Sequence, residues 1–445
     1  MKIQLSDHFT YKRLLRFTLP SIIMMIFTSV YGVVDGFFVS NFTGKTAFSA
    51  VNLIYPFLMI LATVGFIFGT GGTAIVAKTF GEGEKEKANS YFSLFVYVSA
   101  FLGIVLAVFG IVFIRPIAIL LGATKGALLE SCVLYGRIIL LALPFNVLQM
   151  LFQSFFVAAE KPQVGMWVTV ASGITNILLD AVLVILLPQP LKLVGAATAT
   201  ALSQVVGGGV PLIYFFSKNK SILRLGKTRL DFRAILRACV NGSSEFMGNI
   251  SMNIVGMLYN IQLIKYAGED GIAAYGVMMY VNFVFAATAV GYSIGTAPII
   301  GYHDGAKNYN ELKSVLKKSL IILGVLGVSM VALAELLAAP LAKIFVGYDD
   351  GLLRLTVSGF RIFALSFVFV SYAIFSSSFF TALNDGVISA IISFLRALVF
   401  QVAAVLLLPL WFGINGIWFS LIVAEFMAVV LSTIFFIIKR KKYHY

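Results

Sequence analysis

The chain has 445 residues, of which 60% are hydrophobic and only 12% are charged. Soluble domains contain about 45–50% apolar and about 25% charged residues, so this composition excludes ordinary soluble domains. Twelve membrane spans of about 20 residues each fit within the apolar content. The net charge of +14 does not require a nucleic-acid partner, because basic residues collect in the cytoplasmic loops of membrane proteins.

Twelve apolar stretches are long enough to cross a bilayer, and we predict a helix in each. The first six cover residues 14–40, 48–78, 91–113, 128–158, 164–187 and 195–216. The last six cover residues 234–264, 272–300, 319–337, 352–381, 387–408 and 414–438. The predicted fold class is therefore an all-α polytopic membrane protein. Its expected parts are an N-lobe at residues 1–216, a linker at 217–233 and a C-lobe at 234–445.

The distribution of basic residues predicts the orientation. Most of the 33 lysines and arginines fall on one side of the membrane if both termini are cytoplasmic. They cluster at the two ends of the chain, in the second and eighth loops and in the polar linker. The excess of basic residues marks the cytoplasmic side. We therefore expect a multi-pass protein of the cell membrane with both termini and the linker in the cytoplasm.

The two lobes form an internal repeat. A shift of 224 residues, changing to 221 after a slip near Lys161, aligns the halves and pairs Gly32 with Gly256, Gly71 with Gly295, Gly81 with Gly305 and Gly195 with Gly416. Because each half has an even number of spans, both enter the bilayer from the same side. The halves must then be related by a twofold axis along the membrane normal, an arrangement used by secondary transporters that rock around a central cleft.

Several short motifs lie at the ends of the spans: Pro20 followed by Asp35, residues 81–88, residues 298–309, and the glycine-led openings at Gly195 and Gly416. Together they resemble the MATE (multidrug and toxic compound extrusion) transporters over nearly the whole chain. The resemblance implies two six-helix lobes around a V-shaped cleft. It also implies export of cationic or amphipathic organic compounds in exchange for protons or sodium, without a cofactor.

The resemblance further implies coupling-ion ligands on the first, fifth and sixth helices, and the matching positions are Asp35, Asn176, Asp180 and Thr198. Independently, an acid inside a span costs at least ~2.5 kcal/mol unless it is paired or protonated, so each is a functional candidate. Asp35 and Asp180 fall at comparable depth. Two converging carboxylates in a low dielectric do not both ionise unless a cation lies between them. This predicts a proton or sodium switch, with structural hydrogen bonding as the alternative role.

The repeat predicts that the C-lobe lacks this set, because Asp35 pairs with Tyr259 and Asp180 with Gln401. The polar residues expected near mid-span in the C-lobe are Glu245, Arg396 and Glu425. They form either a polar site or a buried structural ion pair.

Two further features bear on movement and substrate. Pro20 cannot donate a backbone hydrogen bond, so we expect a bending point about four turns below Asp35. Spans two and eight carry an adaptable apolar face of the kind found in promiscuous pockets, made of Tyr55, Met59, Met279 and Phe283. Ordinary helix packing or lipid contact is the alternative for these four. The expected partners are small organic cations or amphipathic drugs and the bilayer, and we expect a monomer.

Two other classes of protein are alternatives to a drug transporter. A membrane-embedded enzyme is disfavoured because His8, His303 and His444 lie near the termini or in a loop, where no histidine-based cluster forms within the spans. A lipid-linked oligosaccharide flippase would need several basic residues in its cleft to hold a pyrophosphate. Spans one, two, seven and eight contain almost none, but this class stays open as the alternative.

Overall fold

The computed structural model describes residues 3–123, 126–347 and 349–445, so the first two residues of the predicted N-lobe lie outside the description. The first half contains α1 (Tyr11–Phe42), α2 (Lys45–Gly81), α3 (Lys85–Leu120), α4 (Ala127–Ala158), α5 (Pro162–Leu179), the π-helical segment η1 (Asp180–Val184) and α6 (Gln189–Phe216). The second half contains α7 (Phe232–Gly305), α8 (Tyr309–Val346), α9 (Asp350–Ala364), α10 (Phe367–Ala382), α11 (Gly386–Phe394), the π-helical segment η2 (Leu395–Phe400), α12 (Gln401–Phe412) and α13 (Ile414–Tyr443). The predicted all-α fold is confirmed.

The long helix α7 supplies two of the spans. Ten of the described helices are long and apolar enough to cross a bilayer, and α9 with α10 forms an eleventh span bent by 47°. Within α7 the chain turns at Gly268, whose φ of 62° lies in the left-handed region that glycine adopts without strain. The segments near Ala238 and Tyr302, one on each arm of α7, both pack against α2 near its C-terminal end. The chain therefore reverses at Gly268, which accounts for the twelfth predicted span among the described residues.

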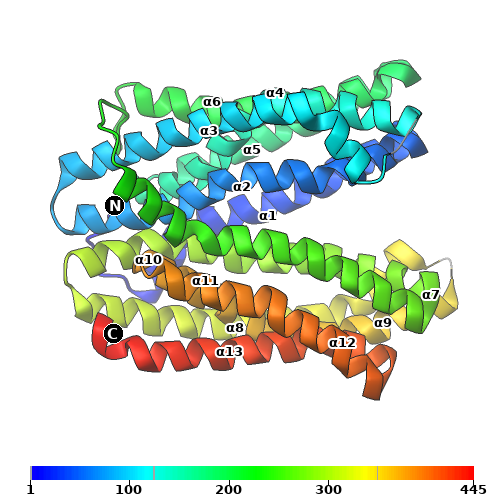
Figure 1. Cartoon of the computed structure of the whole chain (residues 1–445). Helices are drawn as coiled ribbons and strands as arrows, with labels where there is room; N and C mark the ends of the chain where they lie inside the picture. Colours follow the sequence, from blue (N-terminus) through cyan, green and yellow to red (C-terminus); the bar gives the residue numbers. More distant parts are fainter. Residues whose placement is uncertain (1–2, 124–125, 348) are drawn as a thin grey trace.

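Two lobes of helices lie side by side (Figure 1). The N-lobe contains α1 to α6, and the C-lobe contains α7 to α13. Both termini lie at the same end of the molecule as the linker between α6 and α7. We call this end the linker face and the opposite end the open face.

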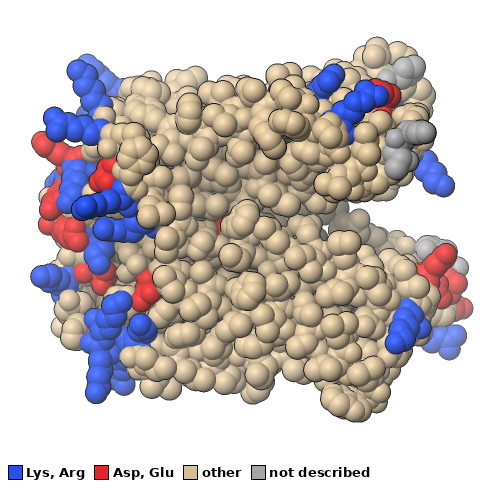
Figure 2. All heavy atoms as spheres, in the orientation of Figure 1, with Lys and Arg blue, Asp and Glu red and all other residues tan. Residues whose placement is uncertain are grey.

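Most of the charge visible in Figure 2 lies at these two ends. Lysine, arginine, aspartate and glutamate gather at the linker face and at the open face, and the broad band between them is almost free of charge. Lipid tails offer no hydrogen bonds or hydration, so an uncharged band of this kind suits the bilayer core. Figure 2 also shows a wedge between the lobes at the open face, whereas the lobes meet at the linker face.

Reciprocal glycine contacts reveal the symmetry of the two lobes. A Cβ added to Gly81 would collide with the backbone of Tyr302, and one added to Gly305 would collide with the backbone of Lys78. The 224-residue shift converts Gly81 into Gly305 and Lys78 into Tyr302. The two contacts are therefore one contact repeated by a twofold axis between α2 and α7. Because both occur at the linker face, the axis runs along the helices, as predicted.

The linker folds back onto the N-lobe. The backbone N–H of Arg224 donates to Asn89 Oδ1 at 2.8 Å, and the N–H of Gly226 donates to Ser93 Oγ at 3.0 Å. Asn89 and Ser93 lie one turn apart on α3. This segment is therefore fastened to one lobe, and α7 begins the other.

The segment before α1, which we call the strap (residues 3–10), crosses between the lobes. The N–H of Leu5 donates to Glu160 Oε1 in the N-lobe at 2.9 Å, and the N–H of Phe9 donates to Glu311 Oε1 at the start of α8 at 2.8 Å. The side chains of Leu5 and Phe9 are buried. The strap thus holds both lobes at the linker face.

Candidate functional site

The site in the N-lobe is centred on Asp35, where α1, α5 and α6 meet. Asn176 Nδ2 lies 3.5 Å from Asp35 Oδ1, and Thr200 Oγ1 lies 3.3 Å from the same oxygen. Asp35 is partly exposed, whereas Asn176 is buried. One carboxylate oxygen of α1 therefore collects donors from two other helices.

Asp180 completes this cluster. It is fully buried, at 0% exposure, and its carboxyl group is close enough to interact directly with that of Asp35. Asp180 begins the π-helical segment η1, and π-helical turns are frequent at functional sites because they re-aim a side chain. The predicted pair of acids from spans one and five is thus brought together.

Three buried oxygen atoms of the cluster have no hydrogen-bond donor among the described residues. They are both carboxylate oxygens of Asp180 and Oδ1 of Asn176. An unpaired buried acceptor is costly, and an unpaired buried charge costs more. A proton on one carboxyl group, or a cation with a preference for oxygen ligands, would satisfy them. The chemistry of these donors and acceptors therefore fits a proton or sodium ion.

On α6, the hydrogen bond to Asp35 comes from Thr200, and the predicted role of Thr198 stays a prediction. Thr198 Oγ1 donates to its own helix, at Val194 O, at 2.7 Å. Thr200, two residues further on, faces Asp35 instead. Two residues correspond to about 200° of rotation around a helix, so these threonines point to opposite sides of α6.

Three tyrosines near Asp35 extend the cluster. The hydroxyl groups of Tyr31, Tyr55 and Tyr135 lie close enough to interact electrostatically with the Asp35 carboxyl group. Of these, only Tyr55 was identified from the sequence, and as part of an apolar face. Tyr31 precedes Asp35 by four residues, a spacing that puts side chains on one helix face and that would have identified it.

The equivalent place in the C-lobe has different chemistry. Tyr259 Oη donates to Gln401 Oε1 at 3.1 Å, and both residues are buried. These are the repeat partners of Asp35 and Asp180. Where the N-lobe has two acids, the C-lobe therefore has a neutral hydrogen bond.

The three polar residues predicted in the C-lobe separate into a pair and a single acid. Arg396 Nε lies 2.8 Å from Glu425 Oε2, and the side chains are 20% and 4% exposed. Glu245 is partly exposed, and its carboxylate forms no ion pair with either residue in the described chain. A C-lobe polar site that includes Glu245 stays a prediction.

The remaining predicted residues lie on three helices of the two lobes. Pro20 is buried inside the continuous helix α1, which also carries Asp35. The residues of the predicted apolar face are all partly or well exposed: Tyr55 and Met59 on α2, and Met279 and Phe283 on α7. Their exposed surfaces are available for contact with a ligand in the wedge or with lipid.

Comparisons with known proteins agree with this architecture. A family model described as MatE matches residues 20–182 and 246–407, one segment in each lobe. The multidrug export protein MepA of Staphylococcus saprophyticus is 26% identical over 421 residues, which cover 93% of this chain and 91% of that protein. MepA of Staphylococcus aureus is 24% identical over 425 residues, with 95% and 92% coverage.

A solved structure shows the same fold. It is the outward-facing conformation of a multidrug resistance MATE family transporter of the MOP superfamily, with a TM-score of 0.92 and 21% identity. The superposition covers 98% of this chain and 97% of that one. The fold of this chain is therefore one already seen in a solved structure.

Proposed function

This chain belongs to the MatE family of membrane transporters, and from that premise we propose that it exports organic cations or amphipathic drugs in exchange for protons or sodium. It is a transporter and not an enzyme. The observation that supports the exchange step is the pair formed by Asp35, which is partly exposed, and Asp180, which is buried, with three buried oxygen acceptors that lack donors among the described residues.

Ion occupancy would alter the packing around α1. An ion or proton at Asp35 neutralises the acid pair and permits closer apolar packing, whereas the charged pair favours water or hydrogen-bond donors such as Asn176 and Thr200. Pro20 leaves the helix one backbone hydrogen bond short, so bending there costs less than elsewhere in α1. Coupling between two ligands is reciprocal. If the ion favours one shape of α1 and the substrate favours the other shape, then binding of the ion lowers the affinity for the substrate.

The substrate class follows from the surfaces available. The exposed aromatic and methionine side chains of α2 and α7, Tyr55 among them, offer adaptable apolar contact with few fixed hydrogen bonds. Such surfaces accept many shapes with modest affinity. The acids Asp35 and Glu245 attract positive charge. A flippase for a pyrophosphate-linked lipid would need basic residues instead, so these features favour cations.

The proposed setting is the cell membrane, with the linker face in the cytoplasm and the chain acting as a monomer. The basic termini and linker support this orientation through the positive-inside rule. The wedge at the open face would then face outward, where substrate leaves.

Purified protein in vesicles tests the proposal. A fluorescent organic cation inside the vesicles, with pH and sodium gradients imposed separately, should leave faster under the coupling gradient than in its absence. Several unrelated cations should compete with it. Equal rates with and without both gradients, or transport limited to one polar anion, would contradict the proposed function.

A further inference from the structure

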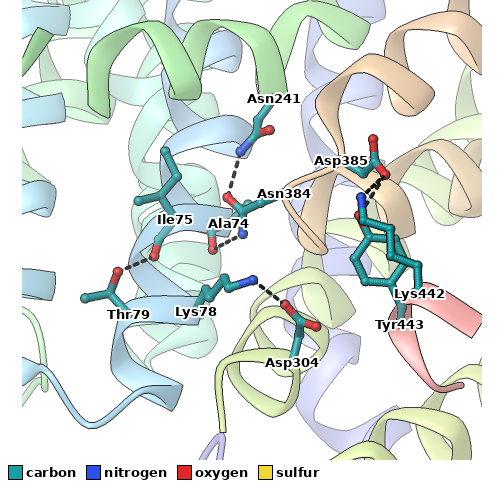
Figure 3. Close-up of polar contacts among 10 residues, drawn as sticks. All are labelled: Ala74, Ile75, Lys78, Thr79, Asn241, Asp304, Asn384, Asp385, Lys442 and Tyr443. Carbon is teal, nitrogen blue, oxygen red and sulfur yellow. Dashed lines mark hydrogen bonds and ion pairs between the residues drawn. The ribbon is translucent and has the colours of Figure 1, made fainter. Parts of the chain in front are cut away.

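The linker face contains polar bonds that join the two lobes directly (Figure 3). Lys78 Nζ, on α2 of the N-lobe, lies 2.8 Å from Asp304 Oδ2, on α7 of the C-lobe. The Asp304 side chain is only 7% exposed and that of Lys78 is 36% exposed. A charge-assisted bond that is largely shielded from water is stronger than a surface ion pair.

This ion pair is not repeated by the twofold axis. The residues that correspond to Lys78 and Asp304 in the opposite lobes are Tyr302 and Phe80. The backbone contacts around the axis are symmetric, but the charges lie on one side of it only. The pair is therefore an addition to the repeated helix packing and is not required by it.

Asn384 forms a second bridge. Its Nδ2 donates to Ala74 O on α2 at 3.1 Å, and its Oδ1 accepts from Asn241 Nδ2 on α7 at 2.7 Å. The backbone of Asn384 has a φ of 58°, a left-handed conformation that asparagine tolerates better than most residues. The turn between α10 and α11 thus positions the side-chain amide of Asn384 to form hydrogen bonds with both lobes.

Both bridges border solvent. A cavity lined by Lys78, Asn384 and Arg237, among others, opens beside them. Water can therefore replace each bond when the lobes part, so these bonds can form and break repeatedly. Breaking them is required for any rocking motion that opens the linker face, because each joins α2 to the C-lobe.

We propose that Lys78, Asp304 and Asn384 form a latch that holds the linker face closed and sets how often the transporter opens there. The latch rests on the proposed function, a transporter whose cleft opens alternately to the two sides of the membrane. It concerns the equilibrium between the inward-open and outward-open shapes. That equilibrium is measurable without transport. Absence of export by the parental protein would count against the proposed function and leave the latch proposal standing, because the latch is tested by the equilibrium between the two shapes alone.

Distance measurements between spin labels test the latch. Labels are placed at Lys85→Cys on α3 and Lys313→Cys on α8, both exposed at the linker face, in a background with Cys132→Ala and Cys239→Ala. We expect Lys78→Met and Asp304→Asn each to raise the ratio of inward-open to outward-open molecules about tenfold. The double exchange Lys78→Asp with Asp304→Lys should restore most of the closed population.

Asn384→Gly tests the second bridge separately, since glycine keeps the left-handed backbone without strain. It should raise the open population severalfold. The matched control for this backbone change is Lys307→Gly, another left-handed position, which should have no effect. The control for charge is Glu130→Gln, which breaks the 2.7 Å pair of Arg115 with Glu130 inside the N-lobe.

The outcomes separate clearly. Longer label distances in the Lys78, Asp304 and Asn384 variants, with parental distances in both controls, support the latch. Parental distances in all three variants would overturn it. The latch would also be overturned if the variant with both charges exchanged were inward-open as often as the single variants. The two charges would then act independently.

Discussion

The two lobes share one backbone plan and differ in what they enclose. At the same place in the repeat, the N-lobe holds Asp35 and Asp180, and the C-lobe holds Tyr259 bonded to Gln401. Among the residues that the structure describes, the first arrangement leaves buried acceptors without donors, and the second joins its two residues by a hydrogen bond. Under the coupling proposed above, one half of the duplicated scaffold is a stable frame while the other half carries the ion chemistry.

The largest expected effect is from Asp35→Asn, which makes the N-lobe resemble the neutral C-lobe. We predict that gradient-driven export in vesicles falls to the level of empty vesicles, because ion binding no longer changes the charge on α1. The protein should remain folded and in the membrane. Export at the parental rate across all proton and sodium gradients would show that the coupling site lies elsewhere, and Glu245 would then be tested.

Asp180→Asn should abolish stabilisation by the coupling ion. A ligand at 100 times its Kd stabilises a folded protein by about 2.7 kcal/mol, so thermal unfolding of the parental protein should shift upward with sodium or with acid. The variant should show no such shift, because it lacks the buried carboxylate. An equal shift in both proteins would remove Asp180 from the site.

Glu425→Gln should reduce stability more than coupling. It leaves Arg396 without its 2.8 Å partner, and an unpaired charge that is mostly buried costs about 2 kcal/mol. Thermal unfolding measures the loss. The double change Arg396→Met with Glu425→Met should recover much of it, and a coupling defect as severe as that of Asp35→Asn would contradict this structural role.

Tyr259→Phe is the counterpart of Asp35→Asn in the C-lobe. It removes one neutral hydrogen bond to Gln401, which should cost about 1 kcal/mol and leave the dependence on ion gradients unchanged. Vesicle export and thermal unfolding measure the two effects. A changed choice of coupling ion would show that the C-lobe takes part in coupling.

The smallest effect concerns Asp385, at the turn before α11. Burial raises the pKa of its carboxyl group, but bonds from Tyr443 Oη at 2.7 Å and Lys442 Nζ at 3.2 Å outweigh burial and leave the pKa below the ordinary 3.8. A lowered folded pKa contributes stability above the ordinary value, and this contribution disappears as pH falls through the lower one.

The corresponding measurement is thermal unfolding of Asp385→Asn and the parental protein as a function of pH. We expect a difference under about 1 kcal/mol at neutral pH, because Lys442 is largely exposed. The two proteins should converge once the pH is well below 3.8. A stability difference between the two proteins that grows as the pH falls would contradict the lowered pKa of Asp385.

Spans, repeat and symmetry were predictable because they depend on patterns along the chain. Hydrophobic runs fix the spans, and recurring glycines such as Gly81 and Gly305 fix the repeat. Asp35 and Asp180 were identified because acids are rare inside membranes. Their proximity was predictable because their positions within the spans place both acids at a similar depth in the membrane.

Rotation of helices about their axes was not predictable in the same way. Thr198 and Thr200 lie at similar depth, and only the packing of α6 against α1 decides which hydroxyl reaches Asp35. The contact between Lys78 and Asp304 depends on how two lobes dock. No periodicity along one chain contains that information.

The strap has a consequence for how the chain is made. The N–H of Phe9 donates to Glu311, a residue synthesised 302 positions later, so this contact cannot form until α8 begins. Contacts this distant in sequence form late. Chains truncated before residue 311 should therefore leave the strap open to protease, and completed chains should protect it. Protection in the truncated chains would show that the N-lobe alone holds the strap.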